Sequence, residues 1–441
     1  MLSKHLILEF FTQNETKLIL MKYKVFLIII ILFFTGINSY SQTITQINEE
    51  FPLGSPYTSF GIGDIQYSSS IRTESMNILG ISLYGDYVNN MNPAANTRLS
   101  FTNVTASFRY NFLKSSDNSK NISASNGNVQ GLNIGIPFNQ SNGWVLNLGF
   151  NPLSQINYKV ITIGNLYGKD YTETYAGNGG MTRINLGMTY KIFSNISVGF
   201  EYNYAFGDLK RISYLDFNDA NYQNSYIRKE NNINGSFFKG GLIFDIGKIL
   251  KAKAIDNLVI GVLYQSKLNL KSELDGIFGS STGLDTIRSL NGDIEIPQAF
   301  GFGITNSFGR VIVSSDFLYQ QWSDYKEGGN TLGIYQNTFR WGLGFAITPP
   351  VKKDLSFWDG IEYRFGGFID NSYFKINNQQ INGYGLGIGF GIPINHFNSI
   401  DLGFNFYTRG KTEQGFIKDN YFKITAGLNF GELWFLKRAE D

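Results

Sequence analysis

The chain of 441 residues contains no cysteine, few prolines and few charged side chains. The absence of cysteine excludes a disulfide framework, a zinc–cysteine site and a cysteine that could carry a lipid anchor. Charged residues make up 16%, well below the roughly 25% of an ordinary soluble domain. The net charge of +2 gives no indication of nucleic-acid binding. The chain is instead rich in hydrophobic residues (42%), aromatic residues (16%) and glycine (49 residues), with a length that suffices for one large fold.

Only one long apolar run is present, and it lies near the N-terminus. Lys22 and Lys24 precede the unbroken apolar stretch Val25–Phe34. Small residues suited to cleavage follow at Gly36, Ser39 and Ser41. This order predicts a signal peptide over residues 1–41, with Met21 as the true start. A membrane anchor is the alternative, but the run is shorter than the about 20 residues that span a bilayer. An exported chain with no later helical span belongs in the periplasm, outside the cell, or in the outer membrane.

Period-2 alternation of apolar and polar residues recurs from about Leu99 to Phe430. Residues 196–206 show it clearly, because every second side chain is large and apolar. Successive side chains of a strand point to opposite faces, so each run predicts a strand with one apolar face. The runs predict fourteen strands, at 98–112, 127–138, 142–163, 181–193, 195–212, 225–247, 255–273, 293–308, 309–323, 336–348, 354–372, 378–394, 397–411 and 418–431.

A soluble β-sandwich also alternates, but the length of these strands favours a membrane barrel. Several runs reach the about 9–11 residues that cross a bilayer at a tilt. Aromatic residues also gather near the strand ends, as an interfacial girdle requires: Tyr202, Tyr204, Phe206, Trp322, Tyr325, Trp358, Trp434 and Phe435. We therefore predict an all-β, antiparallel transmembrane β-barrel of about fourteen strands over residues 98–435, followed by a short tail at 436–441.

The connections between the expected strands alternate in length. Those after even-numbered strands are mostly short, and those after odd-numbered strands are mostly longer and polar. The long ones are expected at Leu113–Asn126, Gly164–Gly180, Ser213–Asn224 and Leu274–Gly292. Short periplasmic turns and longer outer loops are usual in bacterial barrels. This parity places both chain ends in the periplasm and the barrel in the outer membrane.

Residues 42–97 lack a long alternation but are too apolar for a disordered linker. The expected inner face of the barrel is rich in glycine, which leaves room beside the wall. We therefore predict that residues 42–97 form a plug, or hatch, in the lumen. The alternative is a periplasmic tail that binds elsewhere.

Catalytic chemistry is hard to find. A Ser–His hydrolase needs a histidine beside its serine, and after the signal peptide only His396 remains, in an expected periplasmic turn. The acidic stretch Asp216–Asn221 lacks the alternating ligands and the glycine of a calcium loop. We therefore expect no enzyme activity, no cofactor and no metal site.

Several stretches together resemble the FadL/TodX family of outer-membrane transporters, in particular its Bacteroidetes branch. The resemblance covers about residues 51–438 and rests on the order and spacing of short motifs. These are "SPYTSFGIGD" (Ser55–Asp64), Arg72 with Met76, "NPAA" (Asn92–Ala95), "FLYQQWSDY" (Phe317–Tyr325), and the closing stretches "YGLGIGFGIPI", "FNFYTRG" and "DNYFKITAGLNFGELWF". The chain departs from the branch around Met76, where glycines are replaced by Ser75, Asn77 and Ile78.

The resemblance implies a fourteen-stranded barrel with an N-terminal hatch that admits fatty acids, aromatic hydrocarbons or similar molecules by diffusion. The candidate gate is the hatch around Asn92, Pro93 and Ala94, together with Met76, on the expectation that a tight turn held by few contacts can switch.

The resemblance also implies a kinked third strand that opens the wall sideways. Here that strand is 142–163, and Gly149, Asn151 and Pro152 interrupt its alternation. Pro152 cannot donate a ladder hydrogen bond, so pairing should weaken there. An ordinary bulge is the alternative.

Four cations are expected to face the lumen, namely Arg183, Lys267, Arg340 and Arg364. They could contact a substrate carboxylate, or they could be solvated charges and partners of Glu201 and Glu362. The expected partners are a small hydrophobic ligand, membrane lipids and lipopolysaccharide, and the outer-membrane barrel assembly machinery, with no nucleic acid. Two alternatives stay open: a surface carrier related to type IX secretion, and a general porin, which a plug disfavours.

Overall fold

The computed structural model describes residues 51–434 apart from 68–69, 167, 218, 220, 251–254, 281–282 and 353–354. The expected signal peptide, residues 42–50 of the expected plug and the tail at 436–441 lie outside the described residues. Among the described residues, no helix has the length and apolar character needed to cross a membrane.

The described strands form one closed antiparallel sheet of fourteen wall strands, as the sequence predicted. The uninterrupted wall strands are β2 (Thr102–Ser116), β3 (Asn121–Asn139), β4 (Trp144–Leu166), β5 (Lys169–Phe193), β6 (Ile196–Asp216), β7 (Ser225–Asp245), β12 (Val311–Gln320), β15 (Thr338–Ile347), β16 (Glu362–Ile376), β17 (Gln379–Pro393), β18 (Ser399–Arg409) and β19 (Lys418–Glu432). Strand β19 pairs with β2 along their full lengths, which closes the barrel.

Two wall strands are interrupted midway. Strand β8 (Val259–Gln265) continues as β9 (Leu268–Ser280), and both pair with β7. Strand β10 (Gly283–Ile296) continues as β11 (Ala299–Phe308) across Pro297, which has no N–H to donate to a ladder. The predicted ranges 255–273 and 293–308 each span one of these interruptions. The fold class is therefore confirmed, and each predicted range overlaps one wall strand.

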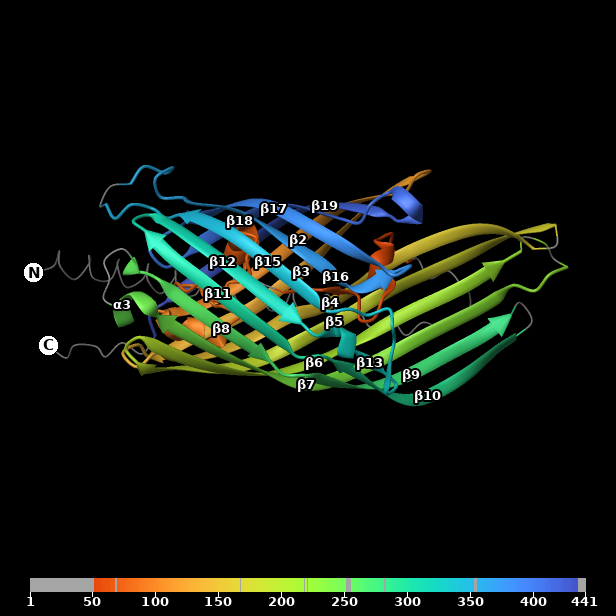
Figure 1. The fold of residues 1–441 in the computed structure, drawn as a ribbon, viewed down its shortest axis with the longest axis horizontal. Helices are drawn as coiled ribbons and strands as arrows, with labels where there is room; N and C mark the ends of the chain where they lie inside the picture. Colours follow the sequence, from red (N-terminus) through yellow and green to blue (C-terminus); the bar gives the residue numbers. More distant parts are fainter. Residues whose placement is uncertain are drawn as a thin grey trace, which may run out of the picture. The chain divides into compact units, whose positions relative to one another are not determined.

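The expectation of long outer loops is wrong. Strand β4 runs to Leu166 and β5 begins at Lys169, so most of the expected loop Gly164–Gly180 is paired strand. The same holds for much of Leu113–Asn126 and Leu274–Gly292, and for part of Ser213–Asn224. Apolar and polar residues alternate along a strand when one of its faces is buried. The alternation is absent where both faces of a paired strand meet water. In Figure 1 the yellow and green strands reach well beyond the blue ones at this end, here called the hairpin end.

Large apolar side chains cover the outward face of the wall, and polar ones face inward. On β2, Phe108 and Phe112 are 48% and 43% exposed, whereas Arg109 and Asn111 between them are buried. Ile388 on β17 is half exposed. A barrel in hydrocarbon needs apolar side chains on its outer face and hydrogen bonds for all its backbone groups. The closed sheet provides these backbone hydrogen bonds.

Two of the expected girdle residues do not lie on the outside. Trp322 and Tyr325 are 0% and 1% exposed. The chain folds inward after β12 through η4 (Trp322–Asp324), the short strands β13 (Lys326–Glu327) and β14 (Asn330–Thr331) follow, and Trp322 stacks on Tyr373 with ring centroids 4.1 Å apart. The aromatic strand end is thus part of the core rather than of a membrane interface.

Residues 51–98, here called the inner segment, pack against the inward face of the wall. They contain η1 (Pro56–Ser59), β1 (Asp64–Ile65), α2 (Ile71–Ser75) and η2 (Pro93–Arg98). Figure 1 shows their red and orange elements among the strands of the barrel. Helix α2 contacts β16 to β19, and η2 contacts β4 to β7, so the segment touches opposite stretches of the wall. The remaining short elements are α3 (Ile246–Leu250) and η5 (Glu413–Gly415).

Candidate functional site

Glycines of the wall make room for the inner segment. A Cβ added to Gly199 would collide with the backbone of Pro93 and Ala94, and one on Gly366 would collide with the carbonyl of Met76. Several other inward-facing glycines are approached in the same way: Gly241, Gly261, Gly342, Gly344, Gly387 and Gly389. The glycine-rich inner face is therefore matched to the segment that lies against it.

A buried carboxylate anchors the middle of the inner segment. Asp316 Oδ2, on β12, accepts hydrogen bonds from the backbone N–H groups of Leu79 (3.0 Å), Gly80 (2.5 Å) and Ile81 (3.2 Å). Gly80 has φ +85°, a conformation that side-chain-bearing residues avoid and that turns consecutive N–H groups toward one anion. Sequence reasoning missed Asp316, although an aspartate at an inward position of a barrel strand was a usable signal.

The four hatch residues are held by many contacts rather than few. Asn92 Nδ2 donates to the carbonyl oxygens of Ile81 (2.7 Å), Leu242 (3.3 Å) and Val262 (3.3 Å). Its Oδ1 accepts a hydrogen bond from the N–H of Ala94 (3.0 Å). Asn92 thereby caps η2, which begins at Pro93. Met76 is fully buried. The expectation of a loosely held turn is wrong, because the asparagine amide bonds the segment and two wall strands at once.

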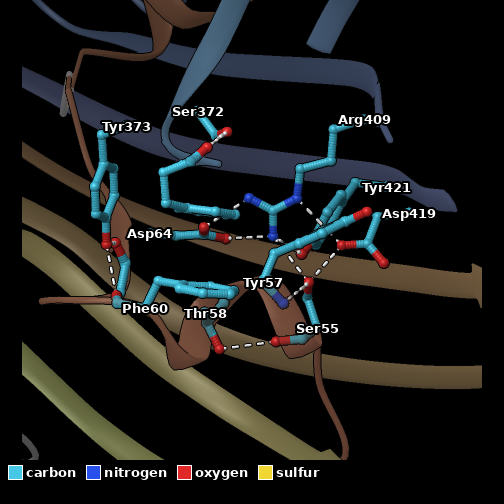
Figure 2. A network of polar contacts seen from close by, with 12 residues as sticks. Ser55, Tyr57, Thr58, Phe60, Asp64, Ser372, Tyr373, Arg409, Asp419 and Tyr421 are labelled. Carbon is cyan, nitrogen blue, oxygen red and sulfur yellow. Dashed lines mark hydrogen bonds and ion pairs between the residues drawn. The ribbon is translucent and has the colours of Figure 1, made fainter. Parts of the chain in front are cut away.

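Arg409 on β18 joins the start of the inner segment to the wall (Figure 2). Its guanidinium donates to both oxygens of Asp64 (2.7 and 3.0 Å), to Ser55 Oγ (2.9 Å) and to Asp419 (3.1 Å). Ser55 in turn donates to Asp419. The hydroxyl of Tyr57 donates to the carbonyl of Ile417 (2.5 Å), and burial, with Asp419 second, raises the pKa of Tyr57. This network, which the sequence did not reveal, holds residues 55–64 against the last two wall strands.

Two further ion pairs hold helix α2 and its surroundings. Arg72 Nε lies 2.9 Å from Glu362 on β16, and Glu74 lies 2.6 Å from Arg109 on β2. All four side chains are at least four-fifths buried. The inner segment thus contributes one cation and one anion from α2, each paired with a wall residue of opposite charge.

The wall is interrupted where the sequence indicated, between β3 and β4. Pairing of these strands ends at Leu132 and Phe150, and a bulge lies between Pro152 and Ser154 in the pairing with β5. Gly149 leaves room for a cluster of asparagines, because a Cβ there would collide with their side chains. In that cluster Asn151 Nδ2 donates to Asn133 (2.8 Å) and Asn185 (3.0 Å). We call the region beyond Phe150 the wall gap.

The inner segment covers the part of the wall gap next to Phe150, up to Asn157. Strand β1 pairs with β4 at Ser154 and Gln155, and the N–H of Gln66 donates to the carbonyl of Leu153 (2.9 Å). Thr58 Oγ1 lies 2.9 Å from the carbonyl oxygen of Asn157 and 3.0 Å from its N–H. The edge of β4 that β3 leaves is therefore taken over by residues 58–66.

Three of the four predicted lumen cations are buried and paired. Arg364 lies 2.9 Å from Glu362 and 2.6 Å from Asp401, and Arg183 lies 3.9 Å from Glu201. Arg340 lies 2.9 Å from Asp370 and stacks over the ring of Phe368. Lys267 is exposed at the interruption between β8 and β9. The three arginines are therefore better explained as partners in structural ion pairs than as cations available to bind a substrate carboxylate.

An apolar pocket lies behind the wall gap. It has a volume of about 50 Å³ and borders Leu153, the residue of β4 at the bulge. Arg183 and Lys239 also line it, but apolar side chains from the inner segment and from the facing wall dominate the lining: Ile62, Ile65, Met91, Leu263, Leu268, Ile296, Leu318 and Trp322. A larger, more polar cavity of about 160 Å³ lies between the inner segment and strands β16 to β19.

Trp322, which lines the apolar pocket, belongs to a cluster of aromatic side chains. The ring of Trp322 stacks on those of Tyr325 and Tyr373. Phe60 stacks on Phe374 with ring centroids 4.2 Å apart. Tyr335, in the turn after β14, belongs to the same cluster, and burial raises its pKa to about 12. The cluster joins the inner segment to the folded-in turn.

Comparison with known proteins identifies a family and several solved structures of similar fold. A family model described as BamG matches residues 21–440. A FadL homologue from Pseudomonas aeruginosa is 12% identical over 83% of this chain and 99% of its own, with a TM-score of 0.60. The toluene transporter TodX from Pseudomonas putida is 14% identical over 85% and 100% of the two chains, with a TM-score of 0.56. The toluene transporter TbuX from Ralstonia pickettii is 12% identical over 83% and 99%, with a TM-score of 0.54. No curated protein matches the chain.

Proposed function

The chain belongs to the BamG family and has the fold of FadL-type transporters, and from this we propose that it is an outer-membrane protein for passive uptake of small hydrophobic compounds. The matching solved structures include a FadL homologue and hydrocarbon channels. They give no support to the carrier or general-porin alternatives. Export to the outer membrane in this proposal uses the signal peptide expected within residues 1–41.

The observation that carries the proposal is the loss of β3–β4 pairing at Phe150 directly beside the apolar pocket. A hydrophobic solute gains nothing from an aqueous pore, whereas an apolar pocket that leads to a gap in the wall lets it reach the membrane. The pocket is about 50 Å³, much smaller than an ordinary ligand site of roughly 300 Å³ or more. Passage therefore requires the inner segment to move away from the wall gap.

The gate in this proposal is the part of the inner segment that pairs with β4. Strand β1 adds only two residue pairs to the exposed edge, at Ser154 and Gln155. Asn92, Pro93, Ala94 and Met76 hold the other end of the segment against the wall and act as its fixed support. Residues 58–66 then swing or slide while residues 76–98 stay in place, a hinge-type motion that also has to release Asp64 from Arg409.

A reversible covalent lock tests this gate. The chain has no cysteine, so Ile65→Cys with Ser154→Cys creates one defined pair at a paired position of β1 and β4. The control pair is Ser116→Cys with Asn121→Cys, at paired positions of β2 and β3 away from the gap. We expect the oxidised Ile65–Ser154 pair to stop uptake of radiolabelled toluene or oleate and reduction to restore it, with the control unaffected. Full uptake by the oxidised lock would refute the lateral route.

The partners proposed for the barrel are the lipids and lipopolysaccharide around its apolar outer face and the outer-membrane assembly machinery. The name of the family, BamG, points to outer-membrane assembly. This supports a physical association with that machinery in addition to the ordinary requirement of a barrel for insertion. Co-purification of the assembly proteins with the folded, mature barrel, rather than with a stalled insertion intermediate, tests the association.

A further inference from the structure

Strand β4 carries an edge that no described residue pairs with at the hairpin end. Strand β3 leaves it at Phe150, and the inner segment follows it only as far as Asn157. On its other side β4 stays paired with β5 up to Leu166. Among the described residues of 51–434, Lys159–Leu166 is therefore unpaired on the side that β3 leaves, and we call it the free edge.

The backbone groups of the free edge are arranged for a further strand. Leu153, Gln155 and Asn157 turn their backbone groups toward the inner segment, while Ser154 and Ile156 between them turn theirs toward β5. Antiparallel strands alternate in this way from residue to residue. Residues 159, 161, 163 and 165 therefore point their N–H and C=O groups away from β5, toward the side that β3 has left.

The free edge stands above the membrane if the hairpin end faces outward, as in bacterial barrels. A strand rises about 3.3 Å per residue, and at a tilt of about 40° Ile161 lies about 40 Å above Trp144, against an apolar band of about 25 Å. Phe150, on the same face of β4, lies within that band. Lipid therefore cannot be the partner of Ile161 and Ile163.

The free edge lacks the features that normally prevent strand addition. Natural edge strands are kept short, charged, bulged or interrupted by proline. Between Lys159 and Leu166 there is one charge and no proline, and Ile161 and Ile163 are 54% and 74% exposed. A long, apolar and unpaired edge in water is a template for another chain.

We propose that the free edge binds an extended segment of a partner protein at the cell surface by strand addition. The same edge already accepts a strand in this way, since β1 pairs with it at Ser154 and Gln155, and the free edge continues that interface upward. Main-chain hydrogen bonds supply affinity in this mode, and alternate side chains supply specificity. The partner segment carries apolar residues at every second position, to cover Ile161 and Ile163, and no proline at the pairing positions.

A second copy of this chain fits the free edge poorly. Two barrels in one membrane are related by rotation about the membrane normal, so both β4 strands run outward. With each strand tilted by about 40°, the two would cross at about 80° instead of lying side by side. A flexible extended segment has no such restriction.

Site-specific photocrosslinking in cells tests the proposal. A photoreactive residue at Ile163 is compared with one at Ile388, which faces outward within the membrane band. We expect a crosslink from position 163 to an alternating apolar segment of one other protein, and none to that protein from position 388. Ile161→Pro should abolish the crosslink, because it removes an N–H that faces the partner while all bonds to β5 remain. Ile161→Val, which keeps the backbone donor, should preserve it.

Heat-modifiable migration on a gel shows whether each variant has folded. If Ile161→Pro does not fold, Ile161→Lys replaces it, because an edge lysine blocks strand addition without altering the backbone. A crosslink that survives both variants would overturn strand addition. A crosslink only to lipopolysaccharide, to a second copy or within the same chain, or no crosslink at all, would overturn the proposal of a partner protein. None of these outcomes bears on uptake, which the cysteine lock measures separately.

Discussion

The carboxylate of Asp316 and the backbone N–H of Gly80 lie 2.5 Å apart, where the middle of the inner segment meets wall strand β12. Asp316 is 1% exposed, and the adjoining N–H groups of Leu79 and Ile81 share its Oδ2 atom. A buried charge is costly unless hydrogen bonds satisfy it, so carboxylate and turn depend on one another. This relationship makes the position of the inner segment testable independently of transport.

Asp316→Leu should detach the turn at residues 79–81 without preventing closure of the barrel. It leaves three buried N–H groups unsatisfied, and leaving even one of them costs about 1–3 kcal/mol. We expect new protease cleavage within residues 76–98 while the gel mobility of the folded barrel is retained. The matched control is Asp117→Leu, because Asp117 accepts similar backbone bonds from Ser119 and Lys120 in an exposed turn. Equal protection of the inner segment in both variants would show that Asp316 is not its anchor.

Two adjacent glycines of β7 provide a test of how closely the inner segment fits the wall. A Cβ on Gly241 would collide with the side chain of Asn92, whereas one on Gly240 would meet open space. Asn92 cannot move freely because its amide bonds Ile81, Leu242 and Val262. We expect Gly241→Ala to lower the free energy of unfolding by about 1–3 kcal/mol, the usual cost of overpacking.

Gly240→Ala is the control for this comparison and should leave the unfolding transition unchanged. Both substitutions add one methyl group to the same strand, so their effects on strand propensity are the same. Equal effects of the two on chemical unfolding in detergent would mean that the inner segment does not press against β7.

The sequence predicted the wall better than it predicted what lies inside. Alternation located all fourteen strands because one face of each meets lipid, and Phe108 with Phe112 shows this pattern directly. The same rule misplaced the strand ends, since residues 164–166 and 169–180 are paired where no face is apolar. It also placed Trp322 in an interfacial girdle, although the chain turns inward there and buries it.

Contacts of the inner segment could not be predicted because they join residues far apart in the sequence. Asp64 and Arg409 are separated by most of the barrel, and no local pattern links them. Pro152 was the exception: proline cannot donate to a ladder, so a single residue indicated the wall gap, and β3–β4 pairing does end two residues earlier. The effect of a proline on strand pairing can be predicted from the local sequence. An ion pair such as Asp64–Arg409 forms only in the closed fold, so the local sequence does not predict it.

The outward direction of the apolar face leads to the last prediction, which compares one substitution at two heights. Ile388→Arg places a charge in the middle of β17, where the side chain is half exposed and faces outward. At the bilayer midplane an arginine costs about 2–4 kcal/mol, so we expect a clearly lower unfolding midpoint in lipid vesicles. Ile163→Arg makes the same change at a position that we place above the membrane, where surface substitutions stay within about 0.5 kcal/mol. A matching loss at both positions would contradict the height assigned to the free edge. No loss at Ile388 would contradict the outward assignment of the apolar face itself, because in water or in the lumen an added arginine has no hydrocarbon to disturb.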